Sequence, residues 1–155
     1  MRGWLLDTNV IASLIAPNGA PSVKNWARIV EERDLFLSIL TLGEYDKSIA
    51  NLAADDANAA RYIAARDALE ARFSGRVLSL DDAIVRRWGA ISGGVKRETG
   101  HSPPVIDTLL AASAIEAEFY LVSRNSRDLA ASGAVVFDPW QDDLTKFPLK
   151  PKPRR

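Results

Sequence analysis

Short apolar runs alternate along this chain with longer segments of helical period, and this alternation most constrains its fold. The runs are rich in Leu, Val and Phe without polar alternation, which is typical of strands buried on both faces of a sheet. Strands separated by helices are joined by right-handed crossovers and lie parallel. The pattern predicts an α/β fold with a parallel sheet between helical layers. Strands are expected at residues 4–6, 35–39, 77–80, 119–123 and 134–137.

The chain is predicted to form one domain followed by a tail. Its 155 residues fit a single domain with one core. The last fifteen residues, QDDLTKFPLKPKPRR, contain three prolines and five basic residues against two acids, which is typical of a disordered, solubilising end. We therefore expect the domain over 1–140 and the tail over 141–155. Helices are expected near 9–15, 20–33, 41–53, 56–73, 82–98, 103–117 and 126–131.

Composition excludes several kinds of chemistry. The chain has no cysteine and one histidine, so disulfides, thiolate nucleophiles, multi-histidine metal sites and a paired-imidazole RNase mechanism are excluded. Twenty basic and twenty acidic residues cancel, so any contact with nucleic acid must be local. No apolar run approaches membrane-spanning length, and the early Asp7 argues against a secretory signal. A cytoplasmic protein is expected, and its chemistry should depend on carboxylates.

Acids near the carboxyl ends of the strands are the first candidates for function, because ligands of an open parallel sheet bind at that edge. Asp7 follows the first strand, where it either caps the helix that begins near Asn9 or takes part in a site. Glu44 lies early in the helix after the second strand. Thr41 and Glu44 together have the spacing of a capping box, so capping and function both remain open for this glutamate.

Asp107 lies in a helix whose capping needs no acid. Ser102 is a natural N-cap and Pro103 a natural first helical residue, which would start the helix one turn before Asp107. The acid shares an apolar stripe with Leu110 and Ala111, and this helix is expected to be buried nearly all round. An unpaired buried carboxylate is costly unless a cation lies nearby. Function is therefore the favoured interpretation of Asp107.

The fourth position follows the strand in YLVSRNSRDL and is held by Asn125 or Asp128. Each has a simple structural interpretation, since Asn125 would cap the next helix and Asp128 would favour its dipole. Three carboxylates with an amide or a fourth carboxylate at one sheet edge would repel one another without a divalent cation. Ligands that are all oxygens suit Mg²⁺, or Mn²⁺ as a substitute, and not zinc.

Four motifs in this order resemble PIN-domain ribonucleases, and specifically the VapC or FitB type of toxin from bacterial toxin–antitoxin modules. They are LLDTNVI, TLGE, PVIDTLLAASA and LVSRNSRDL, and the resemblance runs from residue 3 to FDPW at 137–140. It implies a three-layer α/β/α fold around a parallel sheet and Mg²⁺-dependent endonuclease activity on RNA. The catalytic residues implied are Asp7, Glu44, Asp107, Asn125 and Asp128, and the metal ligands are Asp7, Glu44, Asp107 and Asp128.

The resemblance also implies a mechanism and partners. Water activated by the metal would attack phosphorus, leaving a 5′-phosphate and a 3′-hydroxyl without a cyclic phosphate. A homodimer is implied, and so is a cognate antitoxin that inserts an arginine among the acids. Tyr45 and Trp88 are expected to be core residues rather than base-stacking ones. The candidates for substrate contact are Thr8, Asn9, Ser123 and Arg124.

Two other functions remain open at this point. A receiver or phosphoryl-transfer domain also gathers acids at strand ends, although its phospho-acceptor would have to be Asp81 or Asp82, which look like a helix start. A non-catalytic PIN-like module that binds RNA or a protein is the second alternative, since Asn125 stands where many relatives have an acid. Trapped phosphoaspartate would support the first, and RNA binding without cleavage the second.

Overall fold

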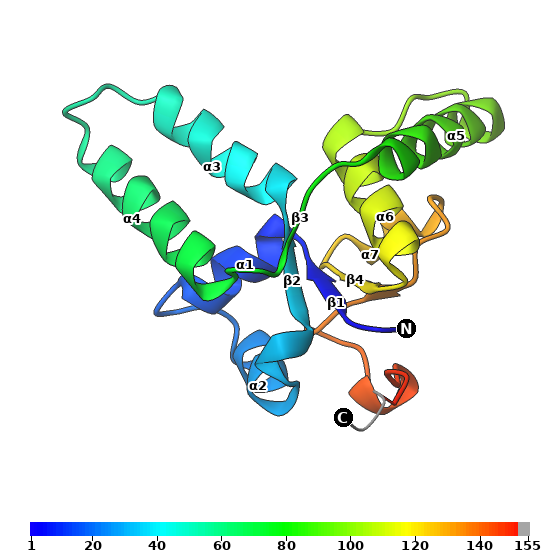
Figure 1. Ribbon diagram of the computed structural model, residues 1–155, viewed down its shortest axis with the longest axis horizontal. Coiled ribbons are helices and arrows are strands. Elements are labelled where there is room, and N and C mark those ends of the chain that lie inside the picture. Colours follow the sequence, from blue (N-terminus) through cyan, green and yellow to red (C-terminus); the bar gives the residue numbers. More distant parts are fainter. Residues whose placement is uncertain (152–155) are drawn as a thin grey trace.

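The parallel sheet predicted from the sequence is present in the computed structural model, which describes residues 1–151 (Figure 1). Within this range five parallel strands form one sheet in the order β3-β2-β1-β4-β5. The chain builds outward from β1 to β3 and then returns to add β4 and β5 on the other side. The order therefore reverses between β1 and β4. The strands are β1 (Trp4–Leu6), β2 (Leu35–Ser38), β3 (Val77–Leu78), β4 (Tyr120–Val122) and β5 (Val136–Phe137).

Seven α-helices connect the strands within the same range and follow the predicted pattern closely. Each strand leads into at least one helix before the next strand begins. Within residues 1–151, no helix combines the length and apolar content needed to cross a membrane. The helices are α1 (Thr8–Ile15), α2 (Pro21–Ile29), α3 (Ile39–Ala50), α4 (Ala57–Arg72), α5 (Asp82–Thr99), α6 (Val105–Ala117) and α7 (Ser126–Ala130).

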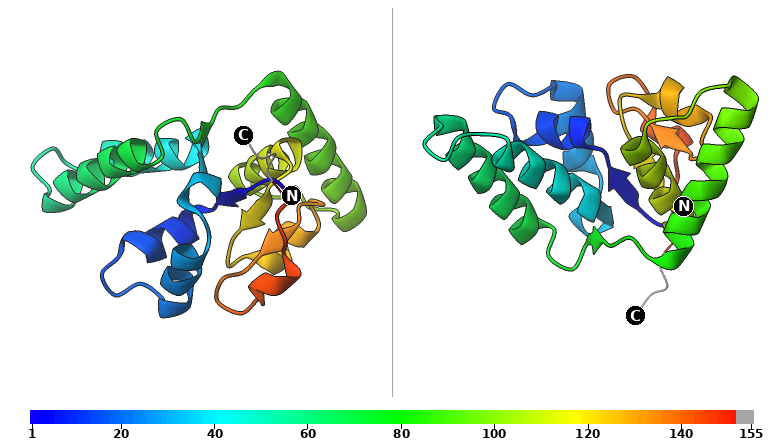
Figure 2. Two further views of the ribbon diagram at one scale, coloured as in Figure 1. Left: turned by 60° about the horizontal axis from the view of Figure 1, so that its bottom comes forward. Right: turned by 90° about the horizontal axis from the view of Figure 1, so that it is seen from above.

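Alternating strand side chains divide the core into two layers. Trp4 and Leu6 of β1 belong to a large cluster that includes buried side chains of α1, α2, α3 and α4. Leu5 belongs to a second cluster with α6 and α7. Two helical hairpins, α3–α4 and α5–α6, diverge on opposite sides of the sheet (Figures 1 and 2). The architecture is thus the predicted three-layer sandwich.

Two predicted helix starts are wrong. α3 begins at Ile39, because the side chain of Ser38 caps it by accepting a hydrogen bond of 3.1 Å from Leu40 N. Thr41 therefore lies inside the helix, and no capping box with Glu44 forms. α6 begins at Val105, with Pro104 at the N-cap and no side-chain cap. The prolines at 103 and 104 disfavour helical backbone in the residue before each, so the helix starts only after them.

This later start places Asp107 in the first turn of α6. Because α6 ends just before β4 begins, the first turn of the helix lies toward the carboxyl ends of the strands. Residues 110–114 of α6 are all buried, as predicted for a helix covered nearly all round. Asp107 itself is only partly buried, which leaves its carboxylate accessible at the sheet edge.

The described part of the expected tail is not a free end. Phe147 packs against Tyr120 and Phe137 with ring centroids 5.3 and 4.9 Å apart. Tyr120 also donates its hydroxyl to Pro148 O at 2.9 Å. Apolar side chains at 144, 147 and 149 lie between the polar ones and pack on the main cluster, which composition alone conceals. Residues 152–155, with three of the predicted tail cations, lie outside the described range.

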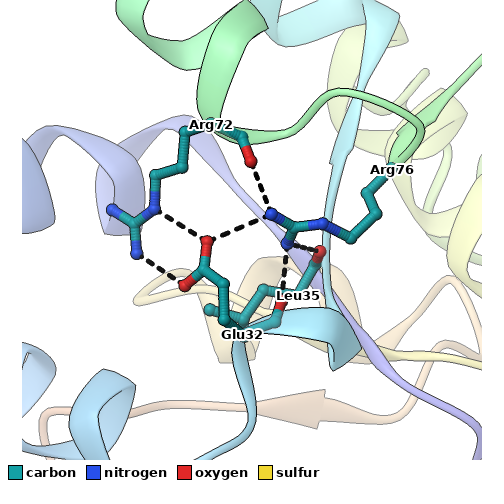
Figure 3. Close-up of polar contacts among 4 residues, drawn as sticks. All are labelled: Glu32, Leu35, Arg72 and Arg76. Atoms are coloured by element: carbon teal, nitrogen blue, oxygen red, sulfur yellow. Dashed lines mark hydrogen bonds and ion pairs between the residues drawn. The ribbon is translucent and has the colours of Figure 1, made fainter.

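A polar clamp holds the base of the α3–α4 hairpin (Figure 3). Arg72 donates two hydrogen bonds of 2.9 Å to the carboxylate of Glu32. Arg76 donates to the same carboxylate at 3.1 Å and to Leu35 O at 2.7 Å. The guanidinium of Arg76 also lies over the buried ring of Phe73, 4.8 Å from its centroid. The clamp joins the end of α4 to the chain that enters β2.

Candidate metal centre

Asp7 lies directly after β1 and is held on both carboxylate oxygens. Oδ1 accepts a hydrogen bond of 2.7 Å from Thr8 N and caps α1. Oδ2 accepts from Ser123 Oγ at 2.6 Å and from Asn9 Nδ2 at 3.2 Å. The residue is only 9% exposed. Capping, one of the two predicted roles of Asp7, is therefore present, and it orients the carboxylate at the edge where a ligand would bind.

Glu44 points from α3 toward the start of α1. Its Oε2 accepts a hydrogen bond of 2.6 Å from Thr8 Oγ1. Thr8 thus links two acids, since its backbone donates to Asp7 and its hydroxyl donates to Glu44. The Glu44 carboxylate therefore contacts α1, a neighbouring element at the sheet edge. In a capping box it would instead have turned back onto the start of its own helix.

Asp107 is in the electrostatic environment of three other acids. Burial, followed by the negative charges of Asp7, Glu44 and Asp128, raises its pKa above the usual 3.8. Asp7 follows β1, Glu44 lies on α3 and Asp128 lies on α7, the helix after β4, so their charges converge with that of Asp107 on α6 where the strand order reverses. Ligands of open α/β sheets bind at this topological switch point.

Asp128 and Asn125, the two candidates for the fourth position, differ in their surroundings. Asp128 is exposed on α7, and its charge contributes to the raised pKa of Asp107. Asn125 occupies the N-cap position of α7, but its side chain does not cap the helix. Its backbone N–H donates to Ser123 Oγ at 3.0 Å instead. The predicted side-chain cap is therefore wrong. Of the two candidates, Asp128 is the one whose charge acts on Asp107, and we group it with Asp7, Glu44 and Asp107 as the acidic cluster.

The donor chemistry of this cluster fits a hard divalent cation. All its ligand atoms are carboxylate oxygens, which Mg²⁺ and Mn²⁺ prefer. Within residues 1–151, no three acidic, histidine or cysteine side chains are arranged to hold a metal ion as they stand. Mutual repulsion among like charges keeps such carboxylates apart, and a divalent cation would draw them together. Holding such an ion would require side-chain rotations that bring these carboxylates together.

Three predicted substrate contacts have structural roles in the site. Ser123 is fully buried, so its hydroxyl holds Asp7 and does not face solvent. Thr8 donates its hydroxyl to Glu44. The amide nitrogen of Asn9 donates to Asp7 and to Ser123 Oγ, and its amide oxygen accepts from the backbone N–H of Arg124. The sequence shows hydroxyls and an amide near the acids, but not which way they point. Of the four predicted substrate contacts, Arg124 is the exposed one.

The structure also places the two aromatic residues predicted for the core and the acids predicted to start a helix. Tyr45 belongs to the main core cluster, as expected. Trp88 is only half-buried and belongs to neither core cluster of the described residues, so the prediction of a core residue is wrong; its indole N–H donates to Thr108 Oγ1 of α6 at 3.0 Å. Asp81 caps α5 by accepting from Ile84 N at 2.9 Å and Asp82 lies in the first turn of that helix, so both acids mark a helix start, as predicted.

Trp140 is the residue that sequence reasoning missed. Its indole ring lies under the guanidinium of Arg124, with Arg124 Cζ 5.2 Å from the ring centroid. The FDPW segment could have indicated it, because Trp140 follows the last strand and therefore lies at the same sheet edge as the acids.

Comparison with known proteins identifies the relatives of this site. The PIN domain family model matches residues 4–132. The chain belongs to the PIN domain family. Toxin FitB from Neisseria gonorrhoeae is 26% identical to this PIN domain over 138 residues, which cover 89% of this chain and 99% of that protein.

Solved structures agree with this assignment. The structure of FitAB bound to an IR36 DNA fragment superposes on this PIN domain with a TM-score of 0.78 and 25% identity, covering 90% of this chain and 97% of the other. VapBC-1 from nontypeable Haemophilus influenzae has the same fold, with a TM-score of 0.74, 21% identity and coverage of 89% and 98%. The predicted resemblance to PIN domains of the VapC and FitB type is confirmed.

Proposed function

We propose that this PIN domain is a Mg²⁺-dependent endoribonuclease and the toxin of a toxin–antitoxin pair. The observation that carries the proposal is the convergence of Asp7, Glu44, Asp107 and Asp128 at the switch point between β1 and β4. Similarity to Toxin FitB supports the toxin role.

The chain's own residues would prepare the reaction by fixing the carboxylates. Ser123 and Asn9 orient Asp7, and Thr8 orients Glu44, so these two acids are fixed before a ligand arrives. Together with Asp107 and Asp128 they would hold Mg²⁺, which would supply an activated water and offset charge on the phosphate. His101 is exposed in a loop, and the mechanism needs no imidazole.

An antitoxin segment is the partner that the surface near the site fits. A groove of about 800 Å³ runs between α1 and α4 and is lined mainly by apolar side chains such as Ile15 and Leu69. It shares Ala12, Tyr45 and Tyr62 with a neighbouring pocket of about 430 Å³ that reaches Glu44. A partner segment lying in the groove would be able to place a cation at the acids and compete with the metal. The toxin–antitoxin complex from Klebsiella pneumoniae, a solved structure that this chain resembles with a TM-score of 0.61, supports this partner.

We also propose a homodimer. The start of α6 carries apolar side chains that no other element covers, with Val105 54% and Ile106 40% exposed. Val85 of α5 is 45% exposed. An interface between two copies would remove this apolar surface from water.

The proposed reaction is tested by the ends of its products. The purified chain is incubated with total bacterial RNA in Mg²⁺, in Mn²⁺ and in EDTA. We expect discrete fragments in either metal, with 5′-phosphate and 3′-hydroxyl ends, and none in EDTA. Cyclic phosphate ends, or equal cleavage in EDTA, would contradict hydrolysis by a metal site. RNA binding without cleavage in either metal would support the non-catalytic module instead.

A further inference from the structure

Arg124 and Trp140 form a stacked pair beside the acidic cluster. Arg124 follows β4 and Trp140 follows β5, so both come from the carboxyl ends of adjacent strands. The guanidinium carbon lies 5.2 Å from the centroid of the indole ring. Arg124 is exposed, whereas Trp140 is partly buried against the main core cluster. An exposed cationic side chain therefore lies on a partly buried aromatic ring.

The backbone of each partner is fixed by neighbouring polar groups. Arg124 N donates to Asn9 Oδ1 at 3.2 Å, and Asn9 Nδ2 in turn donates to Asp7 Oδ2 at 3.2 Å. Trp140 N donates to Oδ1 of the buried Asp138 at 2.9 Å. One amide side chain, that of Asn9, thus links the backbone of Arg124 to Asp7, the first acid of the site.

The guanidinium has its donors free. Within residues 1–151 it forms no ion pair and donates no hydrogen bond, and its contact is with the Trp140 ring. A guanidinium stacked on an aromatic face keeps its planar edge of N–H groups open, and that edge matches the oxygens of a phosphate. The net charge of the chain is zero, so an RNA strand must be held by such local cations.

We propose that Trp140 is a positioning residue that holds Arg124 against a backbone phosphate of the RNA strand next to the one cleaved. This inference rests on the proposed endoribonuclease function. It predicts that Trp140 acts only through Arg124. Removing the ring and removing the guanidinium should then have the same effect, and removing both should add nothing further.

The test measures binding of a single-stranded RNA oligonucleotide in EDTA, where no cleavage occurs, over a range of salt concentrations. The variants are Arg124→Ala, Trp140→Leu and the double variant, with Trp140→Phe as the conservative replacement. Arg124→Ala should weaken binding roughly tenfold and reduce the slope of log affinity against log salt by about 0.7, the value of one phosphate contact on a single strand. Trp140→Leu and the double variant should match it, and Trp140→Phe should restore most of the affinity.

The salt slope separates positioning from a merely structural role, because lost stability alone does not change the number of phosphates contacted. Circular dichroism would establish that each variant is folded, and Trp140→Met, a second non-aromatic replacement expected to match Trp140→Leu, takes its place if Trp140→Leu does not fold. A loss of affinity and slope in Arg124→Ala, with wild-type values in the folded non-aromatic Trp140 variant, would overturn the inference and leave the nuclease intact. Absence of both RNA binding and cleavage in the wild type would overturn the proposed function, and this inference with it.

Discussion

Ser123 donates a hydrogen bond of 2.6 Å to Oδ2 of Asp7 across the two strands where the order of the sheet reverses. The serine is fully buried and the aspartate nearly so. The same hydroxyl oxygen accepts from Asn9 Nδ2 and from Asn125 N. One side chain therefore ties the loop after β4 to the acid after β1.

Ser123→Ala should weaken the metal site more than it weakens the fold. Groups that orient a metal ligand typically contribute roughly 10- to 100-fold in affinity or activity, and we expect a loss of this order in Mg²⁺ binding. Removing one buried hydroxyl should cost about 1–3 kcal/mol of stability. Isothermal titration with Mg²⁺ and urea unfolding measure the two effects.

The matched control is Ser113→Ala. Ser113 is equally buried, but its hydroxyl donates to Leu109 O within its own helix. This variant should bind Mg²⁺ as the wild type does. Equal losses of Mg²⁺ affinity in both variants would show that Ser123 acts through general stability and not through Asp7.

Asp107→Asn should stabilise the metal-free protein at neutral pH. The raised pKa of Asp107 means that the folded state binds more protons than the unfolded state between the two pKa values. Stability therefore falls as the pH rises from about 4, the usual value, through the folded pKa. In EDTA the variant should have the higher Tm at pH 7, and the difference should vanish in acid. A lower Tm for the variant at pH 7 would contradict charge repulsion within the cluster.

Glu32→Gln should loosen the clamp at the base of the α3–α4 hairpin. The hydrogen bond from Arg72 is the main cause that lowers the pKa of Glu32 below its usual 4.5. The stabilisation is therefore present above about pH 4.5 and is lost as the pH falls through the folded pKa. Because the side chain of Glu32 is 48% exposed, we expect a loss of about 0.5–1 kcal/mol at pH 7.

Urea unfolding at pH 7 and at low pH checks this expectation, with Glu31→Gln as the control. Glu31 pairs with Arg33 at 2.6 Å, but the two side chains are 61% and 66% exposed. Its removal should change stability by less than about 0.5 kcal/mol. An effect of Glu32→Gln that persisted unchanged in acid would exclude the ionised clamp as its cause.

Phe147→Ala should destabilise the whole domain, because this ring packs on Tyr120 and Phe137. The ring is only partly buried, so the cost should lie below that of a fully buried phenylalanine, at about 1–3 kcal/mol. Thermal unfolding measures it. Lys146→Ala, one residue earlier and exposed, should leave Tm unchanged. If this segment were only a solubilising tail, both variants would instead have the wild-type Tm.

Periodicity was sufficient to predict the fold, because strands buried on both faces and helices between them leave a strong pattern. Asp7 was predicted as a candidate because parallel strands bring their carboxyl ends together, and Asp107 because an acid without a capping role stood in an apolar helix. Side-chain direction was less predictable. The capping box at Thr41 failed because Ser38, one turn earlier, competes for the same role. The contact of Phe147 with the core was missed because proline and lysine dominate the composition around it.

The central claim is that the acids at the switch point hold a metal that cleaves RNA, and one comparison tests it most directly. Mg²⁺ binding and RNA cleavage are measured together for the wild type, Asp107→Asn and Asp82→Asn. Asp82 lies in the first turn of α5 and is exposed, so it matches Asp107 in helix position. We predict that Asp107→Asn alone loses both Mg²⁺ binding and cleavage while staying folded. Cleavage by a folded Asp107→Asn at the wild-type rate would contradict the assignment of this acid to a catalytic metal site.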